Sequence, residues 1–354
     1  MYYVNEDLVG LDRIFDQNKR QGYLRLDLNE NPVGLPQAFI NKTLAKVDPE
    51  FVAQYPETLE FTEFLAERLG TDIAHLSLVN GSSEGIRNII HAFTSPGGKI
   101  VGVDPSYAMF KVYAEMYGRK FIPVAYSADL TITTNDVISA LDEDTELLVI
   151  VNPNNPMGNV WSKTEVEEMI AAAERLDITV LIDEAYHYFC PVTSVDYALT
   201  HEHVFVTRTF SKLFSLAGAR LGYVAGCPKG IEIVQKLATP HNVNAFALLF
   251  AREIMETPGM VEELVASHAE GRDYICSWLD IHGYTFVSSG GNFMFIKPYG
   301  DARQLVDVMK REKGILIKEY SGIGALGRCL RVTTGPREAM EQFVRALEEL
   351  DLPK

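Results

Sequence analysis

The sequence predicts an α/β fold, with a large domain built on a mostly parallel β-sheet that carries helices on both faces, followed by a smaller α+β domain. Three observations lead to this prediction. Strand-like runs alternate with helix-like segments between about residues 70 and 225, and after residue 250 long amphipathic helices interleave with short strands. The length of 354 residues also exceeds what one hydrophobic core usually organises. We expect an N-terminal arm at 1–40 that packs on the small domain, a large domain at 41–250 and a small domain at 251–354.

The elements of the large domain are read from short apolar or β-rich runs and from the helical segments between them. Strands are expected at 75–80, 99–104, 147–152, 179–183, 203–208 and 221–226. Helices are expected at 83–93, 106–118 and 163–176, and the last begins with a capping box of Ser162 and Glu165. The run at 147–152 is apolar throughout, as in a strand buried on both faces. Ligands of such sheets bind at the carboxyl ends of the strands, so polar residues there are candidate site residues.

The small domain is expected to contain three long helices and three short strands. The helices lie at 261–281, 301–313 and 337–350, and the strands at 291–297, 314–318 and 328–333. The first thirty residues show no clear periodicity and are read as an arm.

Composition excludes several function classes. The 32 basic and 48 acidic residues give a net charge of −16, which argues against binding to nucleic acid or to anionic membranes. No stretch approaches the roughly 18 apolar residues of a membrane span, and the acidic N-terminus does not fit a signal peptide, so a cytoplasmic protein is expected. The four cysteines lie far apart without neighbouring histidines, so neither a disulfide scaffold nor a metal site is expected.

One glycine-rich segment, GIGALG at 322–327, matches the G-x-G-x-x-G pattern of dinucleotide sites. That pattern needs a preceding strand, a following helix and an acidic residue about 20 positions on. A strand-like run, RCLRVTT, follows instead, so we interpret 322–327 as a flexible loop.

Two other segments point to an anion-binding site. NGSSEG at 80–85 joins a strand to a helix, so that Ser82, Ser83 and the first N–H groups of the helix can face one anion, although an ordinary N-cap is an alternative. Thr209, Ser211 and Arg220 follow the strand at 203–208 and provide the hydroxyls and guanidinium that a phosphate prefers. Arg208 adds to the basic character of this turn, for which a solvated basic turn is the alternative.

Lys212 and Asp183 add the potential for chemistry. Lys212 lies among Phe210, Leu213 and Phe214, and an apolar setting lowers the pKa of a lysine and makes its amine nucleophilic. Asp183 ends a buried strand, where a carboxylate needs a cationic partner unless it only caps the next helix. NPNNPMG at 152–158 follows a further strand end and is otherwise a turn. Pyridoxal 5′-phosphate combines a phosphate, a reaction with a lysine amine and a basic ring nitrogen, so it is the expected ligand.

A series of motifs then suggests a family. In chain order they are NENP, YPE, NGSSEG, DPSY, NPNNPMG, DEAY, TFSKLF with AGARLG, GNF and LRVTTG. This order resembles the class I and II aminotransferases of fold type I, which have the aspartate-aminotransferase-like fold, and resembles their histidinol-phosphate aminotransferase branch most. The resemblance covers the chain from Asn29 to beyond Arg337.

The resemblance implies a role for each matching residue around the cofactor. Lys212 would bind the cofactor covalently and move the proton of the substrate Cα, and Asp183 would keep the pyridine nitrogen protonated. Asn155 and Tyr186 would hydrogen-bond the 3′-oxygen of the ring, and Tyr107 would stack on it. The residues implied to hold the cofactor phosphate are Ser82, Ser83, Thr209, Ser211 and Arg220.

The resemblance also implies a homodimer and a substrate side of the site. Tyr55 would reach the cofactor phosphate of the neighbouring subunit. Arg331 would pair with the substrate α-carboxylate, and Asn29 and Asn292 would line the substrate side, unless these two asparagines only cap local turns. The implied reaction is a transamination between small molecules, an amino donor and a 2-oxo acid such as 2-oxoglutarate.

Departures from the branch bear on the substrate, for which histidinol phosphate is the leading candidate. Phe15 lies where the branch usually has a tyrosine, Lys318 lies where it usually has an arginine, and Met157 replaces a frequent threonine. The alternatives are an aminotransferase for another aromatic or phosphorylated amino acid, and a decarboxylase of a phosphorylated amino acid. A ligand-sensing domain without catalysis is disfavoured, because the 28 residues before NENP are too few for a DNA-binding segment.

Overall fold

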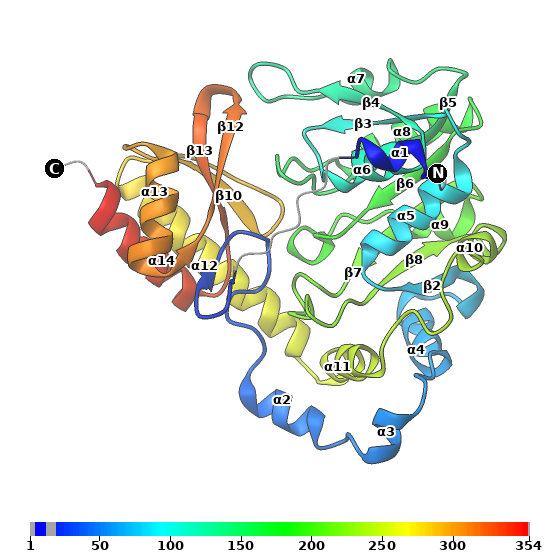
Figure 1. Ribbon diagram of the computed structural model, residues 1–354, viewed down its shortest axis with the longest axis horizontal. Helices are drawn as coiled ribbons and strands as arrows, with labels where there is room; N and C mark the ends of the chain where they lie inside the picture. Colours follow the sequence, from blue (N-terminus) through cyan, green and yellow to red (C-terminus); the bar gives the residue numbers. More distant parts are fainter. Residues whose placement is uncertain (1–3, 12–18, 353–354) are drawn as a thin grey trace.

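A computed structural model describes residues 4–11 and 19–352 of the chain. At its centre lies a seven-stranded sheet with the strand order β2-β8-β7-β6-β5-β3-β4 (Figure 1). Its strands are β2 (Leu76–Val79), β3 (Lys99–Asp104), β4 (Lys120–Ala125), β5 (Thr145–Val151), β6 (Thr179–Asp183), β7 (Val204–Thr209) and β8 (Gly222–Gly226). β8 runs antiparallel to both of its neighbours, and the five strands from β7 to β4 are parallel, so the prediction of a mostly parallel sheet is confirmed.

Helices cover both faces of this sheet because successive residues of its inner strands point to opposite faces. Leu147 and Val149 of β5 pack with α5 (Ser82–Phe93) and α6 (Met109–Met116), whereas Leu148 and Ile150 pack with α8 (Lys163–Glu174) on the other face. The remaining helices of this half are α7 (Thr134–Ile138), α9 (Val195–Thr200), α10 (Pro228–Gln235), α4 (Leu59–Leu69) and α11 (Ala245–Glu256). Two apolar layers therefore hold the sheet rigid, with its carboxyl edge facing the C-terminal half (Figure 1).

The C-terminal half is built on an antiparallel four-stranded sheet with the order β12-β13-β10-β9. These strands are β9 (Thr285–Ser288), β10 (Phe293–Lys297), β12 (Lys318–Ile323) and β13 (Gly327–Thr333). Its helices are α12 (Met260–Ile281), α13 (Ala302–Val308), which continues as a π-helical turn at Met309–Lys313, and α14 (Arg337–Asp351). Helices α12, α13 and α14 and strands β10 and β13 share one apolar core, and the long α12 helix leads from α11 into it (Figure 1).

The N-terminal segment runs between the two halves. It contains α1 (Glu6–Val9), β1 (Leu24–Arg25), α2 (Gln37–Leu44) and α3 (Pro49–Ala53). β1 pairs in parallel with β11 (Ile315–Leu316), and Leu26 is fully buried in the core of the C-terminal half. The domain boundaries at residues 40 and 250 remain a prediction.

The structure departs from the predicted elements at several places. The strand expected at 314–318 is two strands, because Ile315 and Leu316 pair with β1 while Lys318 begins the pairing with β13 in the other sheet. β4, β9 and β12 were not predicted, since their exposed faces interrupt the apolar pattern. The segment 322–327 forms the end of the β12–β13 hairpin, with a short 3-10 turn at Gly324–Leu326, and no helix follows it as a dinucleotide site requires. Among the described helices, none is both long and apolar enough to cross a membrane.

Candidate active site

A cavity of about 130 Å³ lies at the carboxyl edge of the central sheet and brings together most of the residues predicted for the site. The predicted residues that line it are Ser82, Ser83, Tyr107, Asn155, Asp183, Tyr186, Thr209, Ser211, Lys212 and Arg220. They come from the turns and helix ends that follow β2, β3, β5, β6 and β7. Polar groups that are distant in the sequence meet because the parallel strands end at one edge.

One end of the cavity is suited to an anion. α5 begins there after Gly81, and no side chain caps its first turn, so the N–H groups and the positive end of the helix dipole are directed at the cavity. Ser82 and Ser83 lie in this first turn. The Arg220 guanidinium donates to the Ser211 hydroxyl over 3.3 Å and provides the bidentate charge that phosphate prefers.

Gly81 permits this arrangement. Its φ of 72° and ψ of 154° lie in a region that glycine alone adopts readily. A β-carbon at this position would lie 2.5 Å from Nη2 of Arg220, so the guanidinium occupies the space that a larger residue would fill. Arg220 itself has a φ of 56°, an uncommon left-handed conformation for a residue with a side chain.

The other end of the cavity holds a buried carboxyl group. Asp183 is 4% exposed and accepts a 3.0 Å hydrogen bond from the Thr207 hydroxyl on the adjacent strand. Burial raises its pKa to about 6, against the opposing effects of that hydrogen bond and of the Lys212 charge. At neutral pH the group is mainly ionised in an apolar setting, and a cationic ligand group beside it would relieve the cost of burial.

The Lys212 amine lies between these two ends. It donates to the Leu28 carbonyl over 3.3 Å and lies 5.7 Å from the centre of the Tyr186 ring. Its pKa is lowered to about 8, first by burial and then by the positive charge of Arg331. A larger share of this amine is therefore neutral and nucleophilic at pH 7 than for a lysine in water.

A hydrogen-bond network connects Tyr186 to the N-terminal segment and to β13. Asn29 is 1% exposed, and its side-chain amide donates to the Tyr186 hydroxyl over 2.7 Å. Its backbone N–H donates to the Thr333 hydroxyl, and its carbonyl accepts from the Asn292 amide over 3.1 Å. Asn29 therefore does more than cap a local turn, since it links three distant segments beside the cavity.

Arg331 enters the site from β13 and contacts Asn155. Its Nη2 donates to Oδ1 of Asn155 over 2.7 Å, and its guanidinium lies 4.7 Å from the centre of the Phe293 ring. Arg331 is 5% exposed, and its Nε has no hydrogen-bond partner among the described residues. A buried guanidinium with an unmet donor is suited to an incoming anion.

Comparison with known proteins identifies the family. The family model described as aminotransferase class I and II matches residues 21–347. The chain belongs to this family. Among curated relatives, the histidinol-phosphate aminotransferase of Geotalea daltonii is 31% identical over 93% of this chain and 92% of its own length. That of Thermoanaerobacter pseudethanolicus is 31% identical over 92% of each chain.

Solved structures share the fold of this aminotransferase chain. The histidinol-phosphate aminotransferase of Sinorhizobium meliloti, in complex with pyridoxal-5′-phosphate, has a TM-score of 0.83 at 24% identity, covering 92% of this chain and 90% of that one. The enzyme of Clostridium acetobutylicum has a TM-score of 0.81 at 24% identity, covering 92% and 98%. The aspartate-aminotransferase-like fold expected from the sequence is thus confirmed.

Two residues singled out in the sequence lie away from the cavity in this aminotransferase fold. Tyr55 is 75% exposed and stacks on His241 with 4.2 Å between ring centres. The expectation that Arg208 adds to the basic turn was wrong, because Arg208 is buried and pairs with Glu184 over 2.8 Å. Side chains alternate along β7, so Thr207 and Thr209 face the cavity side while Arg208 faces the opposite layer. Phe15 lies outside the described residues.

Sequence reasoning missed a buried network that supports the loop carrying Tyr107. Asn154 is 2% exposed, accepts from the Ser106 hydroxyl over 2.8 Å and donates to the Tyr126 hydroxyl over 2.7 Å. Tyr107 in turn shares a 3.0 Å hydrogen bond with Ser83. A second asparagine beside Asn155 in NPNNPMG was the available signal, and it was read only as a turn former.

Proposed function

We propose that this family member is a pyridoxal 5′-phosphate-dependent aminotransferase that uses histidinol phosphate as amino donor and 2-oxoglutarate as acceptor. One observation carries the proposal. A lysine amine with a pKa of about 8 lies in one cavity between a buried carboxyl group and a helix N-terminus that is flanked by an arginine. The relatives named as histidinol-phosphate aminotransferases support the substrate.

The residues present fit the cofactor. Arg220, the hydroxyls of Ser82 and Ser211 and the first turn of α5 would hold its phosphate. Asp183 is a buried carboxyl group with no cation in direct contact among the described residues, so it would pair with the ring nitrogen. When bound, the cofactor supplies an electron sink for the bond that is cleaved at the substrate Cα.

The chain's own residues then bind, orient and move protons. The Lys212 amine, which is partly neutral at pH 7, would accept the proton from the substrate Cα and donate it to C4′ of the cofactor. Asp183 would hold a proton on the ring nitrogen through its charge. Tyr186, fixed by Asn29, would orient the ring through its hydroxyl.

A pair of cationic residues on adjacent strands supports a phosphorylated substrate. Lys318 of β12 lies directly opposite Arg331 of β13 in the antiparallel pairing, so their side chains leave the same face of the sheet. Two cations side by side suit a doubly charged phosphate better than a single carboxylate. Lys318 keeps the charge of the usual arginine and loses its bidentate geometry.

The test is a reaction of the cofactor-loaded protein with histidinol phosphate and 2-oxoglutarate, followed by measurement of glutamate. Glutamate should form with the wild type and should be absent with Lys212→Ala. Release of carbon dioxide in place of glutamate, or activity with aromatic amino acids but not with histidinol phosphate, would overturn the proposed reaction or substrate.

We also propose a homodimer in which Tyr55 reaches the neighbouring site. Tyr55 is 75% exposed, and Val52 and Leu59 beside it are 62% and 56% exposed, which is a large apolar exposure for one short segment. Sedimentation should show a dimer, and Tyr55→Phe should weaken binding of the cofactor. A monomer that keeps full affinity for the cofactor would contradict this assembly. The cytoplasmic location remains a prediction.

A further inference from the structure

Thr207 of β7 is a buried residue that contacts the carboxyl group of the site. In the parallel pairing of β6 and β7 it lies opposite Asp183, so the two side chains leave the same face of the sheet next to each other. The Thr207 hydroxyl donates to Oδ1 of Asp183 over 3.0 Å. This contact joins two adjacent strands at the carboxyl edge of the sheet, where the candidate site lies.

Packing on the helix side fixes the orientation of the Thr207 side chain. A β-carbon placed on Gly85 of α5 would lie 3.5 Å from Cγ2 of Thr207, so the methyl group faces that helix while the hydroxyl faces Asp183. The surroundings of this methyl group include the apolar side chains of Val79 and Val224. Exchanging the two branches of the side chain would bury the hydroxyl in that apolar layer and place the methyl group against a carboxylate. Thr207 therefore presents its hydroxyl to Asp183 in one orientation.

The charge of Asp183 depends on a few neighbouring groups. After burial, the hydrogen bond from Thr207 has the largest effect on the pKa of Asp183, and it lowers that pKa. The backbone N–H of Ala185 and the charge of Lys212 act in the same direction. Glu184 opposes them, although its own charge is paired with Arg208. Thr207 is thus a main support of the ionised form of Asp183.

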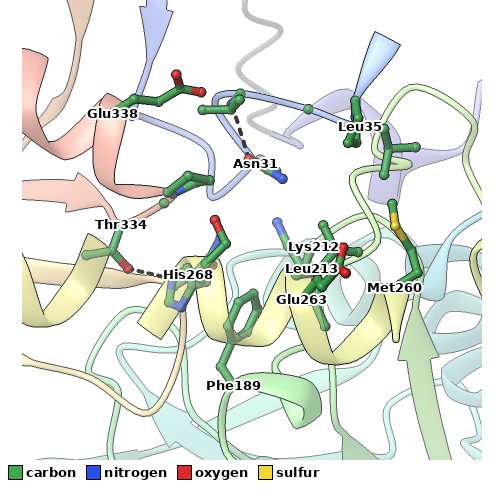
Figure 2. A pocket seen from close by; sticks show the side chains of 18 residues that line it. Asn31, Leu35, Phe189, Lys212, Leu213, Met260, Glu263, His268, Thr334 and Glu338 are labelled. Atoms are coloured by element: carbon green, nitrogen blue, oxygen red, sulfur yellow. Dashed lines mark hydrogen bonds between the residues drawn. The ribbon is translucent and has the colours of Figure 1, made fainter. Parts of the chain in front are cut away.

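The other carboxylates near Lys212 belong to a different space. Glu263 and Glu338 line a separate cavity of about 290 Å³, which Lys212 also lines (Figure 2). Asp183 is not among the described residues that line this cavity, and it faces the smaller one instead. The charge of Asp183 is therefore set within the smaller cavity, where Lys212 and the strand neighbour Thr207 act on it.

We propose that Thr207 is a positioning residue for the cofactor, whose hydroxyl holds the Asp183 carboxylate ionised and in a fixed orientation for the ring nitrogen. This role rests on the proposed function, because it assumes that the ring nitrogen lies beside Asp183. The carboxylate cannot rotate without losing the bond from Thr207, so it is ordered before a ligand enters. A group that is ordered in advance loses less conformational freedom when its ligand binds.

The experiment measures the affinity of the cofactor-free protein for two probes. One is pyridoxal 5′-phosphate, and the other is its deaza analogue, in which a C–H group replaces the ring nitrogen. Both probes carry the phosphate and the aldehyde, so the ratio of their dissociation constants isolates the contact of the ring nitrogen.

The variants separate the hydroxyl of Thr207 from its shape. Thr207→Val keeps the shape and lacks the hydroxyl, whereas Thr207→Ser keeps the hydroxyl and lacks the methyl group. Thr145→Val is the matched control, because Thr145 is also a buried strand residue that donates to an aspartate, Asp142, over 3.0 Å. Thr145 begins β5 and therefore lies at the opposite edge of the sheet from the site.

The wild type should bind pyridoxal 5′-phosphate more tightly than the deaza analogue. Thr207→Val should lower this preference by about 5- to 20-fold, the size expected when a hydrogen bond to a charged group is lost. Thr207→Ser and Thr145→Val should keep the preference of the wild type. Equal binding of the two probes by the wild type, an unchanged preference in Thr207→Val, or an equal loss in either of the other variants would overturn the proposal.

A second measurement distinguishes this inference from the proposed function. If the wild type does not bind pyridoxal 5′-phosphate, the proposed function fails, and Thr207 is tested on the cofactor-free protein alone. Isotope-edited NMR of the aspartate carboxyl groups gives the titration midpoint of Asp183, whose signal is the one missing from Asp183→Asn. The midpoint should be about 1 pH unit higher in Thr207→Val than in the wild type, because a donor to the charged form is lost. An equal midpoint would show that Thr207 does not support the charge of Asp183.

Discussion

The contact between Gly81 and Arg220 predicts that Gly81→Ala weakens cofactor binding. An alanine at this backbone conformation costs about 1–3 kcal/mol. Its β-carbon would also lie 2.5 Å from Nη2 and 3.0 Å from Cζ of Arg220, so the guanidinium must move. A hydrogen bond to a charged group contributes about 1.5–3 kcal/mol, so loss of that geometry should raise the dissociation constant of the cofactor by about 10- to 100-fold.

The assay is a titration of the cofactor-free protein with pyridoxal 5′-phosphate, followed by absorbance. Gly97→Ala is the control, because Gly97 has a similar positive φ of 83° while a β-carbon there meets nothing within 4 Å. Both variants should lose stability in urea, and only Gly81→Ala should lose affinity. If Gly81→Ala binds within twofold of the wild type, or if Gly97→Ala weakens binding equally, the assignment of Arg220 to the phosphate is wrong.

Three further predictions concern the charged groups of the site and of the core. The rate at which the cofactor-free protein takes up the cofactor should increase with pH up to about 8 and then level off, because the neutral Lys212 amine is the form that reacts. If rapid-mixing measurements show a rate that keeps rising toward pH 10.5, the lowered pKa of Lys212 is contradicted. The pKa of Asp183 is raised from 3.8 to about 6, so the folded cofactor-free protein keeps a proton that the unfolded chain releases, and this group destabilises the fold increasingly as the pH rises from about 4 to 6. The unfolding free energy of Asp183→Asn, relative to that of the wild type, should therefore increase by up to about 3 kcal/mol as the pH rises through this window. If urea unfolding gives the same difference between variant and wild type at pH 4 and at pH 7, the raised pKa of Asp183 is refuted. The free energy of unfolding of Arg208→Met should be about 3–5 kcal/mol lower than that of the wild type, because Glu184 stays buried without its partner, while the cofactor affinity of the folded protein should be unchanged. A loss of cofactor affinity without a loss of stability would show that Arg208 belongs to the site.

The sequence predicted strands best where a short run is apolar on both faces of the sheet. The apolar runs of β3 and β6 predicted these strands with the bounds that the structure has, because both faces are buried and no exposed residue interrupts them. β4 lies at the edge of the sheet, contains Pro123 and buries only Val124, so its pattern is weak. The assignment of Ile315 and Leu316 to a sheet of their own depends on a partner strand at Leu24–Arg25, nearly 300 residues away, which no local pattern contains.

The residues of the candidate site could also be predicted only in part. Residues at strand ends, such as Asp183 and Lys212, could be grouped from the sequence because the topology of a parallel sheet brings these ends together. The direction of a single side chain at such an end was harder to predict, as Arg208 shows. Contacts between the halves, such as that of Asn155 with Arg331, arise from packing that the sequence does not state.

The pairing of β1 with β11 has a consequence for biosynthesis. The C-terminal core needs Leu26 and the strand at Leu24–Arg25, which leave the ribosome first, yet their partners at Ile315–Leu316 are made almost last. The central sheet can form while the segment at 24–26 is still unpaired. The entropy cost of joining two segments so distant in the chain grows only slowly with their separation. We therefore expect that a nascent chain halted before residue 315 contains a folded central sheet and an incomplete active site, because Thr333, the partner of the Asn29 backbone N–H, and Arg331, the partner of Asn155, have not yet been made.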